Sequence, residues 1–294
     1  MECGALILGT AARAATVQAP APRVSAAQAL PLRAIEALDE TGAMRPLMIP
    51  IERPLTLLLD GREIVTLMTL GAAPEWLAIG YLRNQLIVED IARLRSVEVD
   101  WLQGTARIAT REPGAPSSPL AVPAGSGGPL ACSLGTVFTD IMRSAPAEAA
   151  SAAAPARLAG PRVPHADLIA ILDSMREHDA IHRAAGSVHS CALFHGRELW
   201  VAVEDVSRHN GVDTITGFMA LHGVGGTDKI LFTTGRLTGE MVMKAAHNGI
   251  TVMVSRNGVT ALGYDLGARC GMTLVGRASK GRYLCYVGSD RIER

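Results

Sequence analysis

Residues 229–255 read KILFTTGRLTGEMVMKAAHNGITVMVS, and this stretch decides the fold. The apolar runs at 229–234 and 250–255 are short, which predicts two buried strands. Between them, residues 237–248 carry apolar side chains at helical spacing. A strand, a helix and a second strand in this order predict two parallel strands in one sheet, with the helix packed on its face.

The same alternation continues on both sides of this unit. Further apolar runs predict strands at 188–194, 199–205, 272–277 and 282–287. Further helical patterns lie at 164–181, 210–223 and 259–270. We therefore predict an α/β domain over residues 164–294. Its helices are expected to cover a mostly parallel sheet, with an antiparallel hairpin formed by residues 188–205 on one side.

The sequence of the first half of the chain indicates three further segments. Residues 1–45 are rich in Ala, Pro and Arg and show no period, which predicts a poorly ordered tail. Residues 46–111 combine strand patterns with a helix that opens at Pro74, which predicts a small, strand-rich α+β subdomain. Residues 112–163 are dense in Gly, Pro, Ser and Ala, and predict a mobile loop that carries Cys132, followed by a linker.

Composition argues against several classes of function. The 294 residues include 28 Lys+Arg and 28 Asp+Glu, and this balance argues against general nucleic-acid binding. The sequence has no apolar run of about 18 residues, the length that a membrane span needs, and no clear signal peptide. We therefore expect a cytoplasmic protein. The cysteines are scattered, and no group of Cys and His shows the spacing of a zinc site.

The densest polar cluster is EDVSRHN, residues 204–210. It follows a predicted strand and opens a predicted helix, with Asn210 as a candidate N-cap. Polar residues at the carboxyl ends of strands form the sites of α/β sheets, so Arg208, His209 and Asn210 are candidate ligand-binding residues. His189, at the start of the preceding predicted strand, is expected to approach His209. The structural alternatives are a capped helix with solvated charges and a hydrogen-bonded core histidine.

Two further clusters are basic and contain glycine. TTGRLTGE, residues 233–240, runs from a strand into a helix, and its Gly235 and Arg236 suit a phosphate at a helix N-terminus. RASKGR places three cations between the last two predicted strands and suits a phosphate or pyrophosphate. Its candidate residues are Arg277, Ala278, Ser279, Lys280, Gly281 and Arg282. An ordinary turn with solvated charges is the alternative for both clusters.

Several blocks of the sequence together resemble one family, the FdhD proteins. EDVSRHNGVD and AGSVHSCALF are similar to two of its blocks. TTGRLTGEMVMKAAHNGITVMVSRNGVTAL and GMTLVGRASKGRYLCYV are similar to two more, in the same order and spacing. IERPLTLLLDG and EWLAIGYLRNQLI resemble its amino-terminal blocks more loosely, so the resemblance covers most of the chain after residue 46.

The resemblance implies both a fold and a function. The implied fold is an α/β/α sandwich with a mixed sheet, similar to that of cytidine deaminases but without zinc. The implied function is sulfur delivery to formate dehydrogenase. A loop cysteine receives sulfur from a cysteine desulfurase as a persulfide and passes it to the molybdenum bis-guanine-dinucleotide cofactor, of which GDP is an analogue. The loop motif Cys-x-x-Cys matches Cys132 to Gly135, so Cys132 is the implied carrier and Gly135 replaces the second cysteine. The cofactor-binding stretch of the family matches residues 277–282.

Two other functions stay open at this point. The chain could hold the cofactor for insertion without moving sulfur, as a chaperone. It could also be a hydrolase that uses His189, His209 and Asp205 on a nucleotide-like substrate. The expected partners are the desulfurase and formate dehydrogenase, and whether the protein forms a homodimer is left open.

Overall fold

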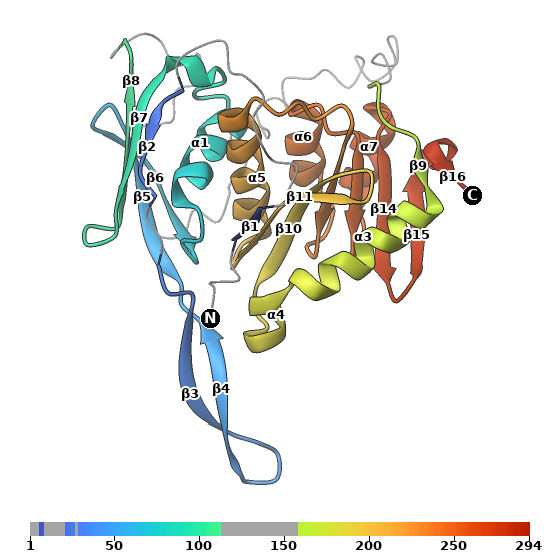
Figure 1. Ribbon diagram of the computed structural model, residues 1–294, viewed down its shortest axis with the longest axis horizontal. Coiled ribbons are helices and arrows are strands. Elements are labelled where there is room, and N and C mark those ends of the chain that lie inside the picture. The colour runs from blue at the N-terminus through green and yellow to red at the C-terminus, as the bar shows by residue number, and fades with distance from the viewer. Residues whose placement is uncertain (1–5, 9–20, 27–28, 113–157) are drawn as a thin grey trace.

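The structure is a computed structural model that describes residues 6–8, 21–26, 29–112 and 158–294. Its main body is a seven-stranded mixed sheet with the order β1-β11-β10-β12-β13-β14-β15 (Figure 1). The strands are β1 (Leu6–Leu8), β10 (His189–His195), β11 (Glu198–Asp205), β12 (Lys229–Thr233), β13 (Val252–Ser255), β14 (Thr273–Ser279) and β15 (Arg282–Val287).

The prediction of a mostly parallel sheet is wrong. The pairs β12–β13 and β13–β14 are parallel, and the other neighbouring described strands of this sheet are antiparallel. Short turns join β10 to β11 and β14 to β15, and such turns can connect only antiparallel strands. The strand β12 then lies beside β10 rather than β11, which adds another antiparallel pair.

Helices cover both faces of this sheet. On one face lie α5 (Arg208–His222), α6 (Gly239–His247) and α7 (Ala261–Arg269), and on the other lies α3 (His165–His178) (Figure 1). Alternate residues of β10 pack into the two resulting cores, since Leu193 belongs to one and Ala192 and Phe194 to the other. The predicted α/β/α class is therefore confirmed, while the closer likeness to cytidine deaminases stays a prediction.

A second sheet with the order β2-β7-β8-β5-β6 lies beside the main body. Its elements are β2 (Arg23–Val24), β5 (Arg53–Leu59), β6 (Arg62–Thr69), α1 (Pro74–Asn84), η1 (Ile91–Arg93), β7 (Leu94–Asp100) and β8 (Thr105–Thr110). The helix α1 packs against α5 at a very short backbone distance. A Cβ atom at Gly80 would lie 1.7 Å from the Asp213 carbonyl oxygen, and one at Gly217 would lie 1.8 Å from that of Trp76. The two glycines thus bring the backbones of α1 and α5 into direct contact along their lengths.

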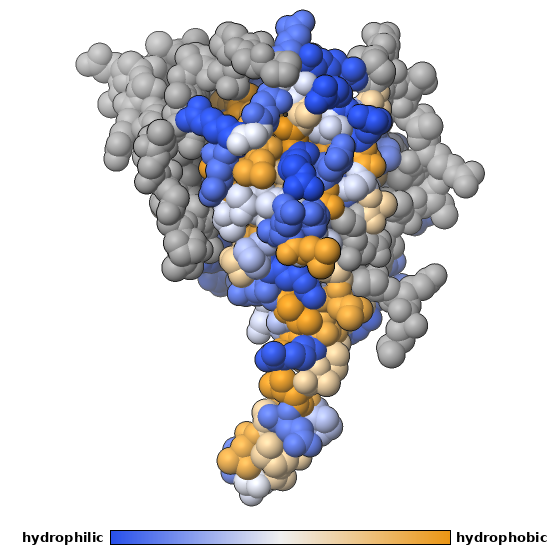
Figure 2. All heavy atoms as spheres, turned by 90° about the vertical axis from the view of Figure 1, so that its left-hand side faces the viewer, coloured by the Kyte–Doolittle hydropathy of each residue, from blue (hydrophilic) through white to orange (hydrophobic). Residues whose placement is uncertain are grey.

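A hairpin arm projects from the body (Figures 1 and 2). It consists of β3 (Leu32–Leu38) and β4 (Met44–Pro50), which pair only with each other among the described strands. Asp39 orders the turn, because its carboxylate accepts hydrogen bonds from the backbone N–H groups of Thr41 and Ala43. The predicted poorly ordered tail over residues 1–45 is therefore wrong for this segment, which cross-strand pairing holds in place without any strong local period.

The remaining described elements are small. They are β9 (Val163–Pro164), α4 (Ala180–Ala185), η3 (Ser289–Arg291) and β16 (Ile292–Glu293). Within the described part of the chain, no helix combines the length and the apolar character that a membrane crossing requires.

Candidate functional site

The predicted polar clusters meet at one edge of the main sheet. His189 begins β10 opposite Asp205, the last residue of β11. Thr234 follows β12, and its carbonyl oxygen accepts a hydrogen bond of 2.8 Å from the Asn257 side chain. The backbone carbonyl of Asn257 accepts in turn from the N–H of Arg277, also at 2.8 Å. These contacts connect the ends of the central strands and define what we call the carboxyl edge.

Arg208 and the turn after β12 pack directly together at this edge. A Cβ atom at Gly235 would lie 2.7 Å from both Cβ and Cδ of Arg208, so only glycine permits this contact. Ser255 at the end of β13 fixes the same turn by donating a hydrogen bond of 2.6 Å to the Gly235 carbonyl. The exposed Arg236 follows. The structure thus brings together the predicted clusters at 204–210 and 233–240.

The pKa of His189 is affected by several nearby basic side chains. Burial lowers the pKa of its ring, and electrostatic interactions with Arg208, His182, His209 and Arg236 lower it further. His189 and His209 therefore interact electrostatically, in surroundings that suit an anion.

Residues 277–282 form the end of the β14–β15 hairpin. Ser279 pairs with Arg282, and Lys280 and Gly281 between them have φ values of 51° and 72°. Two positive φ values are typical of a tight two-residue hairpin turn. Arg277, Lys280 and Arg282 are exposed, whereas the Ala278 side chain is buried. The turn thus presents three cations at the carboxyl edge. Together with Arg208 and Arg236, we call these residues the edge cations.

The start of α5 differs from its predicted form. Ser207, not Asn210, is the N-cap, because its backbone is extended and its hydroxyl accepts a hydrogen bond from the N–H of His209. Asn210 lies inside the helix, and its amide donates hydrogen bonds to Asp205 and to the Met68 carbonyl. This amide therefore connects the two sheets.

Asp205 is the buried acceptor at the base of the site. Its carboxylate accepts hydrogen bonds from the backbone N–H groups of Leu70 and Ser207, the Thr69 hydroxyl and the Asn210 amide. Burial raises its pKa to about 6, although these hydrogen bonds oppose the rise. Its hydrogen-bond partners among the described residues include neither His189 nor His209. The three residues of the predicted hydrolase do not form a relay here.

The raised pKa of Asp205 predicts a pH-dependent stability. The folded protein holds a proton on this carboxyl up to about pH 6, whereas the unfolded chain releases it near pH 3.8. Between these values the folded state binds more protons, so Asp205 makes the free energy of unfolding fall as pH rises. We expect the stability difference between wild type and Asp205→Asn to change by about 2–3 kcal/mol between pH 4 and pH 7. Urea denaturation of both proteins at each pH measures it, and a constant difference would contradict the assignment.

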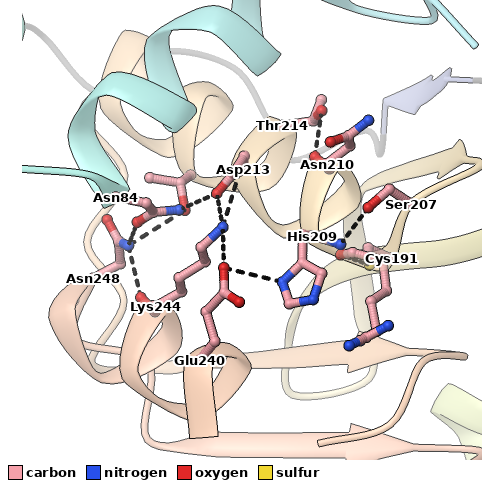
Figure 3. A network of polar contacts seen from close by, with 12 residues as sticks. Asn84, Cys191, Ser207, His209, Asn210, Asp213, Thr214, Glu240, Lys244 and Asn248 are labelled. Atoms are coloured by element: carbon pink, nitrogen blue, oxygen red, sulfur yellow. Dashed lines mark hydrogen bonds and ion pairs between the residues drawn. The ribbon is translucent and has the colours of Figure 1, made fainter. Parts of the chain in front are cut away.

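A second buried polar network lies behind the start of α5 (Figure 3). The Lys244 ammonium lies 2.9 Å from Asp213 and 3.3 Å from Glu240, whose carboxylate also lies 3.2 Å from Nδ1 of His209. Asn84 donates a hydrogen bond of 2.7 Å to Asp213 and accepts one from Asn248. Sequence reasoning missed this network. The available signal was a lysine within the apolar helical pattern of residues 239–247.

The short helix α4 is attached to the same edge by two carboxylates. Glu204 accepts hydrogen bonds of 2.8 Å from the backbone N–H groups of Ile181 and His182, at the start of α4. Asp179, just before α4, forms an ion pair with Arg256 after β13. Burial raises the pKa of Glu204, and the two backbone hydrogen bonds oppose that rise. Glu204 thus positions a helix at the site.

None of the cysteines that the structure describes carries an activated thiol. Burial raises the pKa of Cys191 to about 12, and it raises the pKa of Cys270 and Cys285 as well. A sulfur nucleophile needs the thiolate, which these values disfavour. The predicted carrier, Cys132, lies outside the described residues. The described ranges also contain no group of three His, Cys, Asp or Glu side chains that could hold a metal ion.

Comparisons with known proteins agree with this architecture. A family model described as the FdhD/NarQ family matches residues 50–293. The sulfur carrier protein FdhD of Geobacillus kaustophilus is 27% identical over 244 residues, which cover 83% of this chain and 89% of that protein. Its namesake from Chromobacterium violaceum is 29% identical over 234 residues, covering 76% and 82%.

A solved structure is similar over nearly its whole length. A protein of Desulfotalea psychrophila, described as a formate dehydrogenase accessory protein, superposes with a TM-score of 0.68 at 25% identity. The likeness covers 89% of this chain and 98% of that one. Since the family model spans most strands of both sheets and every residue of the carboxyl edge, the chain belongs to the FdhD/NarQ family.

Proposed function

We propose that this protein is a cytoplasmic sulfur carrier that serves formate dehydrogenase by acting on its molybdenum cofactor. Relatives named sulfur carrier protein FdhD and a structure described as a formate dehydrogenase accessory protein support the role. The single observation that carries the proposal is the set of cations along the carboxyl edge of the main sheet, with Arg208 and Arg236 around His189 and three exposed cations in the β14–β15 turn. The cargo is the bis-guanine-dinucleotide form of the cofactor, whose phosphates match these cations.

The edge cations have the chemistry that a guanine dinucleotide requires. Pyrophosphate groups bind to guanidinium and ammonium groups by charge-assisted hydrogen bonds. Glycine at 281 lets a ligand approach the backbone closely, because nothing lies within 4 Å of the position that its Cβ would take. His189 and His209 add two imidazoles next to Arg208 and Arg236. The buried Asp205 and Asn210 hold the strand and helix that carry these groups.

Sulfur loading is assigned to Cys132 by the family motif. Its thiolate attacks the terminal sulfur of the persulfide on a cysteine desulfurase, the sulfur–sulfur bond there breaks, and the desulfurase cysteine leaves as a thiolate. The sulfur is then held on Cys132 as a persulfide. Its release as sulfide takes two electrons from another thiol, which becomes part of a disulfide. Because Gly135 replaces the second cysteine of the motif, that thiol comes from outside the loop.

A cofactor chaperone without sulfur transfer is the second candidate. The replacement of one motif cysteine by Gly135 favours it, since an internal disulfide relay is not available to this motif. Both candidates require the same ligand site and differ only at Cys132. If the protein is a sulfur carrier, Cys132→Ala is expected to lose sulfur loading and to keep nucleotide binding. The chaperone is not expected to load sulfur, so the substitution would cause no such loss.

Charge reversal in the β14–β15 turn tests the ligand site. We expect Arg282→Glu to weaken GDP binding about ten- to a hundredfold, because one charge-assisted contact contributes about 1.5–3 kcal/mol. The effect is expected to be larger at low salt, where screening is weaker. Isothermal titration of GDP measures it. Arg95→Glu, an exposed charge reversal on the second sheet, is the matched control. Equal affinities of wild type and Arg282→Glu would identify the turn as a plain charged hairpin.

A further inference from the structure

His209 lies between a buried ionic network and the carboxyl edge (Figure 3). Its side chain is 9% exposed, and its Nδ1 lies 3.2 Å from Oε1 of Glu240. Neither of these two buried atoms makes a hydrogen bond of normal geometry, so the contact between them is an ion-pair contact. Contacts of this kind often tighten when a ligand binds. The Nδ1 atom of the ring thus faces the network and is not available to a ligand.

Glu240 determines which nitrogen carries the proton in the neutral ring. Burial by itself raises the pKa of Glu240, but the contacts with His209 and Lys244 outweigh burial and hold it below its usual value. Glu240 is therefore an ionised carboxylate, which accepts hydrogen bonds and donates none. The hydrogen of a neutral His209 consequently resides on Nδ1, and Nε2 carries only a lone pair.

Nε2 is the nitrogen left for a ligand. No hydrogen bond joins Nε2 to any residue that the structure describes. Because it is not one of the buried atoms without a partner, Nε2 is accessible from outside. A phosphate oxygen can only accept a hydrogen bond, so it pairs with Nε2 only when the ring is protonated on both nitrogens. We propose that His209 binds an anionic oxygen of the nucleotide as an imidazolium, with Glu240 as its positioning residue, so that ligand binding takes up a proton.

The charges around His209 support this coupling. Lys244 contributes one positive charge, while Asp213 and Glu240 contribute two negative charges, so an imidazolium would make the buried group neutral. The charged and titratable groups that surround the ring or its network come from α1, α4, β10, α5, α6 and the turn after β12: Tyr81, His182, His189, Arg208, Asp213, Arg236, Glu240 and Lys244.

The test measures protons rather than affinity, and it rests on the proposed nucleotide site. GDP is titrated calorimetrically at pH 8, where its terminal phosphate is already ionised, in buffers of different ionisation enthalpy. The dependence of the heat on the buffer gives the number of protons taken up. We expect net uptake by the wild type, and at least a halving of it in both His209→Asn and Glu240→Gln.

Two further variants make the result specific. His195→Asn removes another carboxylate-paired imidazole, because His195 lies 3.4 Å from Asp228 at the opposite end of β10, and it is expected to leave proton uptake unchanged. His189→Asn shows how much of the proton uptake comes from the neighbouring imidazole of His189. GDP binding without uptake, or uptake that persists in both His209→Asn and Glu240→Gln, would overturn this inference alone. Absence of GDP binding by the wild type would overturn the proposed nucleotide site as well.

Discussion

Lys244→Met is expected to lower the free energy of unfolding by about 3–5 kcal/mol, the usual cost of leaving a buried charge without its partner. The Lys244 side chain is fully buried. Burial by itself lowers its pKa, but the carboxylates of Asp213 and Glu240 outweigh burial and raise it, so the amine is charged. Without it, two carboxylates remain together in the interior. Methionine occupies a similar volume, so the loss is electrostatic rather than a cavity effect.

Urea denaturation followed by circular dichroism measures this loss. Lys280→Met makes the same substitution at an exposed turn and is expected to change stability by less than about 0.5 kcal/mol. The double variant Lys244→Met with Asp213→Asn removes one of the stranded carboxylates and is expected to recover at least about 1 kcal/mol relative to the single variant. A single variant as stable as wild type would show that the network contributes no net stability.

The main sheet was predictable because its strands and helices carry strong local patterns. The run at 229–255 already specifies a strand, a helix and a strand, and the structure contains all three. Strand direction was harder to predict, because whether β12 lies beside β10 or β11 depends on packing between elements rather than on local sequence. The arm of β3 and β4 was missed for a similar reason, since pairing across the hairpin and contacts with α4, rather than a local pattern, hold it.

The candidate site was also predictable only in part. The clusters at 204–210 and 233–240 were found because each follows a strand, and strands of one sheet bring their ends together. The ionic network was not found, because its members lie far apart in the chain: Asn84 donates to Asp213 across 129 positions. The N-cap was misassigned to Asn210 because Ser207 and Asn210 are both good capping residues, and only the backbone geometry distinguishes them.

Cys132→Ala is expected to abolish sulfur loading completely while retaining GDP binding. A persulfide forms on an activated thiolate. Cys191 is buried with a pKa near 12, and the pKa values of Cys270 and Cys285 are also raised, so none of these can replace Cys132. Cys285→Ala, which removes a half-buried thiol, is the matched control and is expected to load like wild type. GDP binding without sulfur loading of the wild type would favour the chaperone.

The most direct test of the sulfur-carrier proposal is mass spectrometry after incubation with a cysteine desulfurase and cysteine. The expected result is the addition of one sulfur atom to the peptide that contains Cys132, reversed by a reducing thiol and absent from Cys132→Ala. Undiminished labelling of the Cys132→Ala protein, or addition of sulfur to Cys191, Cys270 or Cys285 instead, would contradict the assignment.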